Sequence, residues 1–152
     1  MIFFSDKTNY GCGGGNTETA YEYVQSVGGL QLDSAYPYTS YYDETGTCKV
    51  DSTKFKITVD EYYSVEGESN MQEHVLGTGP LSVCLAASSW SSYTSGIVSS
   101  CDKNVDHCVQ VVGVDTDNEY WIVRNSWGTS WGEGGYIYLK TVSITSLKNE
   151  RW

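Results

Sequence analysis

The chain has 152 residues, a hydrophobic fraction of 39% and a formal net charge of −10. This length suits one domain or an incomplete piece of a larger one, and the 13 Tyr and 5 Trp residues supply bulk for a buried core. The negative charge argues against nucleic acid and acidic membranes as partners, and no apolar run is long enough to span a membrane.

The first third of the chain predicts a glycine-rich turn followed by a helix. Residues 9–15 are rich in glycine, which permits positive φ. A phosphate-binding loop is the rival interpretation, but no Gly-Lys-Ser/Thr sequence follows. Residues 16–27 are predicted to form a helix, because Asn16 or Thr17 can cap its start and two glycines follow its end. Residues 36–46 are expected to be an extended aromatic loop.

The middle of the chain predicts short strands and one short helix. Residues 55–65 alternate enough to predict a strand with Ile57, Val59 and Tyr62 facing inward. Residues 70–76 predict a helix that carries His74, which we interpret as a solvated side chain. Residues 81–86 and 136–140 predict two further strands.

The order of these elements suggests two subdomains, because the helical part comes first and the strand-rich part follows. We expect a remnant of a helical subdomain over residues 1–54 and a β-rich subdomain over residues 55–140. Residues 141–152 show no clear pattern and are expected to form a divergent tail.

Residues 106–114 and 120–128 are two apolar, β-branched runs separated by a short polar break, which predicts a β-hairpin. His107 stands at the start of the first strand and Asn125 at the end of the second. Antiparallel pairing would bring these two side chains together. A His that is oriented by a neighbouring amide is one half of a catalytic apparatus, and the other half would be a nucleophile.

The cysteines stand at positions 12, 48, 84, 101 and 108, which is an odd number. Their spacing and the presence of only 2 His residues argue against a zinc site, and we expect no cofactor. Richness in Gly, Tyr and Cys favours a secreted, disulfide-bonded protein, with the odd cysteine unpaired or separated from its partner. Residues 1–4 are too short for a signal peptide and lack a basic leader.

Several short motifs follow one another along the chain: Asn-Tyr-Gly-Cys-Gly-Gly at 9–14, Tyr-Pro-Tyr at 36–38, Gly-Pro-Leu-Ser-Val at 79–83, Asp-His at 106–107, Asn-Ser-Trp-Gly at 125–128 and Trp-Gly-Glu-Gly-Gly-Tyr at 131–136. Over roughly residues 6–140 the chain therefore resembles the papain-like cysteine peptidases, the family that includes the cathepsins. The resemblance implies an α+β, papain-like fold with a truncated helical subdomain and an antiparallel, β-barrel-like subdomain.

The resemblance also implies roles for individual residues. His107 matches the imidazole that pairs with the catalytic thiolate, Asn125 matches the amide that orients this ring, and Trp127 matches the indole that shields their hydrogen bond. Gly14 and Gly15 match a turn whose backbone pairs with an extended substrate. Positions at or beside the walls of the main specificity pocket are Thr17, Cys84, Asp106 and Cys108.

The chain departs from the family pattern at the nucleophile. In the family, the nucleophilic Cys and the Gln that helps to bind the oxyanion precede the glycine-rich turn, and this chain begins after both. The family's disulfide pattern leaves Cys12, Cys48 and Cys101 without partners. Cys84 and Cys108 lie on strands expected to be neighbours, and they either bridge each other or remain packed free thiols.

We therefore expect the later part of a papain-like cysteine endopeptidase, without peptidase activity as this chain alone. One alternative is a non-catalytic homologue that binds peptides or proteins. Another is one chain of a two-chain peptidase, whose missing N-terminal segment or second chain carries the nucleophile. The expected partner is a peptide or protein substrate, and the expected location is lysosomal, vacuolar or extracellular. Residues 12–40 are expected to be the less stable part of the isolated chain.

Overall fold

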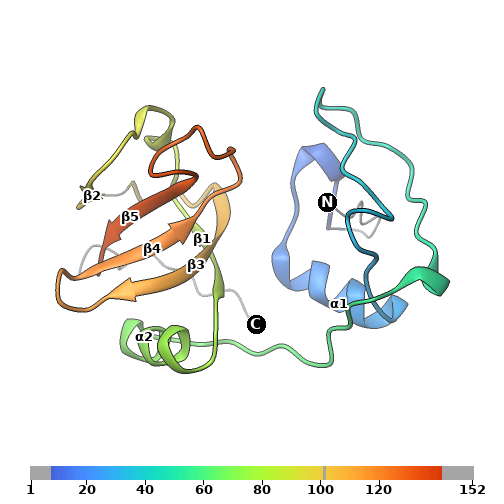
Figure 1. Ribbon diagram of the computed structural model, residues 1–152, viewed down its shortest axis with the longest axis horizontal. Coiled ribbons are helices and arrows are strands. Elements are labelled where there is room, and N and C mark those ends of the chain that lie inside the picture. Colours follow the sequence, from blue (N-terminus) through green and yellow to red (C-terminus); the bar gives the residue numbers. More distant parts are fainter. Residues whose placement is uncertain (1–7, 101, 142–152) are drawn as a thin grey trace. The chain divides into compact units, whose positions relative to one another are not determined.

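A computed structural model of the protein describes residues 8–100 and 102–141, which form two compact units that divide between Tyr62 and Tyr63. Predictions that concern Cys101, the first residues or the tail after Thr141 lie outside the described residues. The subdomain boundary expected after residue 54 stays a prediction. Each unit is described below by itself (Figure 1).

The first unit contains the predicted helix, α1 (Thr17–Val27), between two single turns of 3-10 helix, η1 (Gly11–Gly13) and η2 (Ser52–Lys54). The side chain of Asn16 accepts a hydrogen bond from the backbone nitrogen of Thr19 at 3.0 Å, which satisfies one of the free N–H groups at the helix start. Gly28 ends the helix in the left-handed region, with φ of 91°. The predicted helix and its caps are confirmed.

The strand predicted over residues 55–65 is wrong. The segment forms a single bridge, between Ile57 and Leu30, and no ladder continues from it. A strand needs a row of partners along its length, and Leu30 supplies one. Ile57, expected to face inward, is 47% exposed, while the hydroxyl of Tyr62 donates to a carboxylate oxygen of Glu22 at 2.8 Å.

The second unit is built on one sheet with the strand order β1-β3-β4-β5-β2. Its elements are α2 (Glu68–Gly77), β1 (Leu81–Leu85), η3 (Trp90–Ser92), β2 (Ile97–Val98), β3 (His107–Asp115), β4 (Tyr120–Arg124) and β5 (Tyr136–Lys140). All neighbouring strands pair antiparallel except the short β2, which pairs parallel with β5. The predicted helix, hairpin and two further strands are thus confirmed, whereas β2 was not predicted.

The core of the second unit lies on one face of this sheet. Alternate residues of each long strand point into it because successive side chains of a strand face opposite ways. Figure 1 shows α2 beside β3, and the Met71 side chain of this helix is 1% exposed. The buried strand residues of this core are Leu81, Val83, Leu85, Val109, Val111, Trp121, Val123, Ile137 and Leu139.

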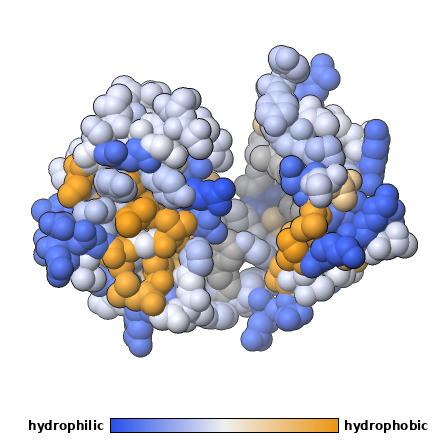
Figure 2. All heavy atoms as spheres, viewed as in Figure 1, coloured by the Kyte–Doolittle hydropathy of each residue, from blue (hydrophilic) through white to orange (hydrophobic). Residues whose placement is uncertain are grey.

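The first unit, by contrast, buries little apolar surface among its described residues. Val24 is the one large hydrophobic side chain there that is fully buried. The second unit buries the core named above. Figure 2 shows further hydrophobic atoms exposed over β3 and β4 on the face in view, surrounded by hydrophilic residues. Hydrophobic stabilisation scales with the apolar area removed from water. The second unit therefore gains more of this stabilisation than the described part of the first unit.

Candidate active site

The hairpin brings His107 and Asn125 together, as the sequence predicted. His107 is the first residue of β3, and Asn125 follows the last residue of β4. Nε2 of His107 lies 2.8 Å from Oδ1 of Asn125. The same oxygen accepts a hydrogen bond from the backbone nitrogen of Ser126 at 2.8 Å.

These two contacts determine the tautomer of the imidazole. A backbone N–H can only donate, so the atom of Asn125 that faces Ser126 must be the carbonyl oxygen. Since that oxygen can only accept, Nε2 of His107 carries the hydrogen and donates it. In the neutral ring, Nδ1 is therefore the nitrogen with a free lone pair, and it is the atom able to take up a proton.

Two tryptophans contact this imidazole, and a third packs against both of them. The ring of Trp127 stacks on that of His107 with centroids 5.2 Å apart and planes 25° apart, while Trp90 presents its edge at 6.2 Å and 85°. Trp131 contacts both indoles, at 5.1 Å from Trp127 and 6.3 Å from Trp90. Trp90 is 1% exposed and Trp127 is 41% exposed. The hydrogen bond of His107 thus lies beside a partly desolvated aromatic cluster, which strengthens it.

The glycine-rich loop that carries two of these indoles is held by backbone contacts. The nitrogen of Asn125 donates to the oxygen of Gly135 at 2.9 Å, and the nitrogen of Gly135 donates to the oxygen of Trp131 at 2.7 Å. The indole nitrogen of Trp131 donates to the backbone oxygen of Trp90 at 3.1 Å. The loop is therefore closed on itself and anchored to η3.

Tyr93 completes the packing on the far side of Trp131, with ring centroids 5.5 Å apart. Burial raises the pKa of Tyr93, so its hydroxyl stays protonated and donates to the backbone oxygen of Gly96 at 2.7 Å. Trp90, Tyr93 and Trp131 were not identified from the sequence as parts of the site. The aromatic residues that follow β1, Trp90 and Tyr93, were the sequence feature that could have indicated this packing.

Asp106 holds the chain directly before His107. Its carboxylate oxygen Oδ1 accepts from the backbone nitrogen of Ala87 at 2.7 Å, and its own backbone nitrogen donates to the oxygen of Leu85 at 3.0 Å. The position suggested by the family resemblance, at a pocket wall, remains a prediction. Through these two hydrogen bonds Asp106 joins the end of β1 to the start of β3.

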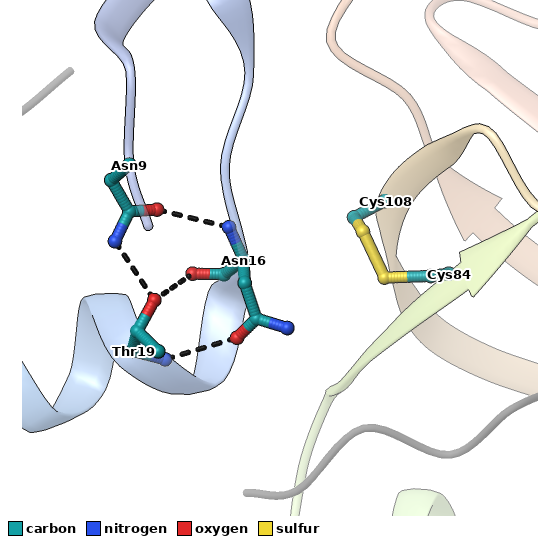
Figure 3. The surroundings of a disulfide bond; sticks show 5 residues. All are labelled: Asn9, Asn16, Thr19, Cys84 and Cys108. Carbon is teal, nitrogen blue, oxygen red and sulfur yellow. Dashed lines mark hydrogen bonds between the residues drawn. A yellow bond between two sulfur atoms is a disulfide. The ribbon is translucent and has the colours of Figure 1, made fainter. Parts of the chain in front are cut away.

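Cys84 and Cys108 form a disulfide, which confirms the first of the two alternatives left open by the sequence. They stand directly opposite each other in the β1–β3 ladder, with Cα atoms 4.0 Å apart (Figure 3). A disulfide sulfur is neither nucleophile nor base. Their expected place near a specificity pocket is a separate prediction that the bond itself does not test.

The remaining predicted site residues belong to the first unit. Gly14 has a φ of 96°, which favours glycine there. A side chain on Gly15 would meet Oδ1 of Asn9, and this atom accepts from the backbone nitrogen of Asn16 at 2.9 Å (Figure 3). Thr17 begins α1, and its buried hydroxyl has no partner among the described residues. The substrate-binding roles of Gly14, Gly15 and Thr17 stay predictions.

Two free cysteines are described, both in the first unit: Cys12 is exposed and Cys48 is half-buried. In the part of the chain that the structure describes, no group of acidic, His or Cys side chains could hold a metal ion. Over the same residues, neither helix has the length and apolar character needed to cross a membrane.

Comparison with known proteins identifies the class to which this fold and site belong. The family described as "Papain family cysteine protease" matches residues 4–150, and the chain belongs to this family. It is similar to a "Viral cathepsin" of Adoxophyes honmai nucleopolyhedrovirus, with 34% identity over 151 residues, and to "Digestive cysteine proteinase 3" of Homarus americanus, with 38% identity over 143 residues. These matches cover 95% and 89% of this chain, but 44% of each relative.

Among solved structures, the bromelain protease from Ananas comosus in complex with the E64 inhibitor superposes with a TM-score of 0.78 and 31% identity. The match covers 93% of this chain and 70% of that one. The predicted family and the papain-like α+β fold are thus confirmed. The chain spans less than half the length of the curated relatives described above.

Proposed function

We propose that this chain carries the acid–base half of a papain-type peptide-hydrolysing site. The observation that carries the proposal is the 2.8 Å hydrogen bond from Nε2 of His107 to Asn125, which leaves Nδ1 able to exchange a proton. A base needs a fixed tautomer and a fixed direction before its basicity is useful. Asn125 supports both, and the stacked ring of Trp127 restricts rotation of the imidazole.

The proposed chemistry uses a cysteine thiol as nucleophile. His107 takes the thiol proton at Nδ1, and the thiolate adds to the carbonyl carbon of the scissile peptide. The imidazolium returns the proton to the leaving amine as the C–N bond breaks, which leaves a thioester. Water, deprotonated by His107, then displaces the thiolate and releases the carboxylic acid product.

The nucleophile is proposed to come from outside this chain's own cysteines. Cys84 and Cys108 are joined in a disulfide, and none of Cys12, Cys48 and Cys101 stands in the sequence context of the family's nucleophile. Losing a nucleophile lowers turnover by about a millionfold. We therefore expect this polypeptide alone to show no peptide hydrolysis and no labelling by an epoxide probe for papain-like enzymes.

The test combines the pure chain with a segment that carries a Cys-Gly-Ser-Cys-Trp-like sequence, supplied in cis as an N-terminal fusion. Hydrolysis of a fluorogenic peptide should appear with the fusion, and His107→Ala should abolish it. Replacing the second Cys of the added segment with Ser is the matched control. Turnover by the unfused chain that is blocked by thiol alkylation would refute the proposal.

A second candidate is a non-catalytic module that binds peptides. The observation that favours it is the exposed turn at Gly14 and Gly15. The backbone of Gly14 bonds within this turn, to Gly11 and Tyr10, so it presents Gly15 as the residue that would pair with an extended peptide. Binding of peptides by the unfused chain, lost on Gly14→Val, would support this candidate. If the fused protein then failed to hydrolyse the same peptides, the result would favour the binding module over the peptidase.

A peptide or protein is the proposed partner in either case, and the proposed location is lysosomal, vacuolar or extracellular. The Cys84–Cys108 disulfide supports such a compartment, because structural disulfides persist under oxidising conditions. Redox-state mapping of these two cysteines in the protein isolated from its natural source tests this assignment.

A further inference from the structure

The end of β3 that carries His107 is supported by one strand only. The β3–β4 ladder begins at the pair Gln110 and Arg124, so β4 does not pair with the residues of β3 before Gln110. They pair with β1 alone, and His107 lies opposite Leu85. β1 is itself an edge strand of the sheet. The backbone of His107 is therefore held to the fold through an edge strand, which is a weak support by hydrogen bonding alone.

Two connections between β1 and β3 stand on either side of His107. The disulfide of Cys84 and Cys108 lies on the rung that follows it. Asp106, which precedes it, accepts from Ala87 beyond the end of β1 at 2.7 Å. A covalent connection and a charged hydrogen bond thus enclose a single residue, which limits how far its backbone can move.

The disulfide acts on this backbone and not on the imidazole directly. Successive side chains of a strand face opposite ways, so His107 shares its face with the buried Val109 and Val111, while Cys108 points to the other face. The partner of Cys108, Cys84, is buried yet lies outside the core cluster that contains its neighbours on β1. The ring of His107 contacts Trp127 and Asn125 from this end of the strand.

We propose that Cys84, Cys108 and Asp106 are positioning residues for His107. The disulfide and the Asp106 carboxylate fix the first residue of β3 against β1, and this sets the direction of the imidazole toward Asn125. The proposal rests on the proposed function for its catalytic meaning. Its structural content, the orientation of one ring, is measurable without turnover.

Reduction is the cleanest way to remove one of the two connections. A dithiol supplies two electrons and two protons to the S–S bond, giving the thiols of Cys84 and Cys108, and becomes a cyclic disulfide itself. The other two described cysteines, Cys12 and Cys48, are already free thiols and do not change. Air or an added disulfide reverses the step, so each sample serves as its own control.

The readout is the NMR signal of the His107 ring in the full chain. The stacked indole of Trp127 displaces the imidazole proton resonances by its ring current. The chain has 2 His residues, and the other, His74, contacts Tyr63 at a ring distance of 5.7 Å. We expect reduction to remove most of the displacement at His107 and to leave His74 unchanged.

Substitutions separate positioning from general stabilisation. Cys84→Ala/Cys108→Ala should reproduce the reduced spectrum while the methyl signals of the buried core stay in place. Asp106→Ala should also shift the His107 resonances, and Asp106→Asn should restore them, because an amide oxygen can still accept from the nitrogen of Ala87.

Either of two results would overturn the proposal. One is an unchanged His107 spectrum when mass analysis shows that the disulfide is reduced. The other is loss of the core methyl signals together with the His107 shift, because the bond would then support the whole unit. Neither result depends on hydrolysis. The positioning role can therefore be refuted while the proposed function holds, and the proposed function can be refuted while the positioning role holds.

Discussion

Removal of the Cys84–Cys108 bond should lower the free energy of unfolding of the second unit by about 3.5 kcal/mol. The bond connects residues with a sequence separation of 24. In the chain-entropy relation, closing a loop of this size removes about 12 cal/mol/K from the unfolded ensemble, which corresponds to about 3.5 kcal/mol at 25 °C. This is a large fraction of the stability of a unit of this size, since domains are stable by only about 0.1 kcal/mol per residue.

Urea denaturation followed by tryptophan fluorescence measures this change. All four described tryptophans, Trp90, Trp121, Trp127 and Trp131, belong to the second unit. With a denaturant slope of about 1.5 kcal/mol/M, the midpoint of Cys84→Ala/Cys108→Ala should fall by about 2 M relative to the oxidised protein.

The matched control replaces the two described free cysteines, Cys12 and Cys48, with Ala. Neither contributes a disulfide, so the stability of the second unit should change by less than about 0.5 kcal/mol. A loss below about 1 kcal/mol in the disulfide variant, or an equal loss in the control, would refute the reasoning.

Three further changes test other parts of the structure. Glu68→Ala should cost about 1 to 3 kcal/mol in urea denaturation, because the indole nitrogen of Trp121, which donates to Glu68 at 3.1 Å, would be left unpaired; Glu68→Gln should recover part of the loss. Gly132→Ala should cost more in thermal denaturation than Gly134→Ala, because both have positive φ but only the former would place Cβ 2.6 Å from a backbone oxygen. Burial raises the pKa of Tyr21 from 10.0 to about 12, which favours its neutral form in the fold. Helix α1 should therefore be fully stable below about pH 10 and lose stability as the pH rises toward 12. Circular dichroism checks this, and Tyr21→Phe should flatten the profile.

Elements with strong local signals were predictable from the sequence. The helix α1 has a polar cap at Asn16 and a glycine, Gly28, after its last turn. These residues mark the helix ends in the sequence, because they satisfy backbone N–H and C=O groups that have no partner within the helix. The hairpin of β3 and β4 was predictable because two β-branched runs flank a polar break. In that break, the Asp115 carboxylate accepts from the backbone nitrogens of Asp117 and Asn118 at 3.1 and 2.9 Å.

Elements that depend on distant partners were not predictable. β2 is only Ile97–Val98, too short for any periodicity, and it exists because β5 offers it a parallel edge. Residues 55–65 show the opposite case, since their alternation predicts a strand but only Leu30 pairs with them. Trp90 was missed as a neighbour of His107 because the two residues stand 17 positions apart and the sequence between them gives no sign of their contact.

The geometry of the candidate site depends on a feature that lies away from it, the irregularity between Val111 and Gly113 in β3. On the turn side of it, Val114 pairs with the buried Trp121, and on the site side, Val111 pairs with Val123. The inward-facing residues of β3 are therefore three apart across this point, where a regular strand would place them two or four apart.

This extra residue decides which side chain reaches Asn125. Suppose that β3 were regular all the way from His107 to Val114. Cys108 would then share the core face with Val114 and His107 would point the other way, because a slip of one residue exchanges the two faces of a strand. With the bulge, His107 and Asn125 both have the inward parity, and the disulfide lies on the opposite face. No polar residue marks the bulge between Val111 and Val114, so the sequence hides this change of face. Because of the bulge, the side chain of His107 and the disulfide of Cys108 lie on opposite faces of β3. The two residues are therefore adjacent in the sequence without contact between their side chains.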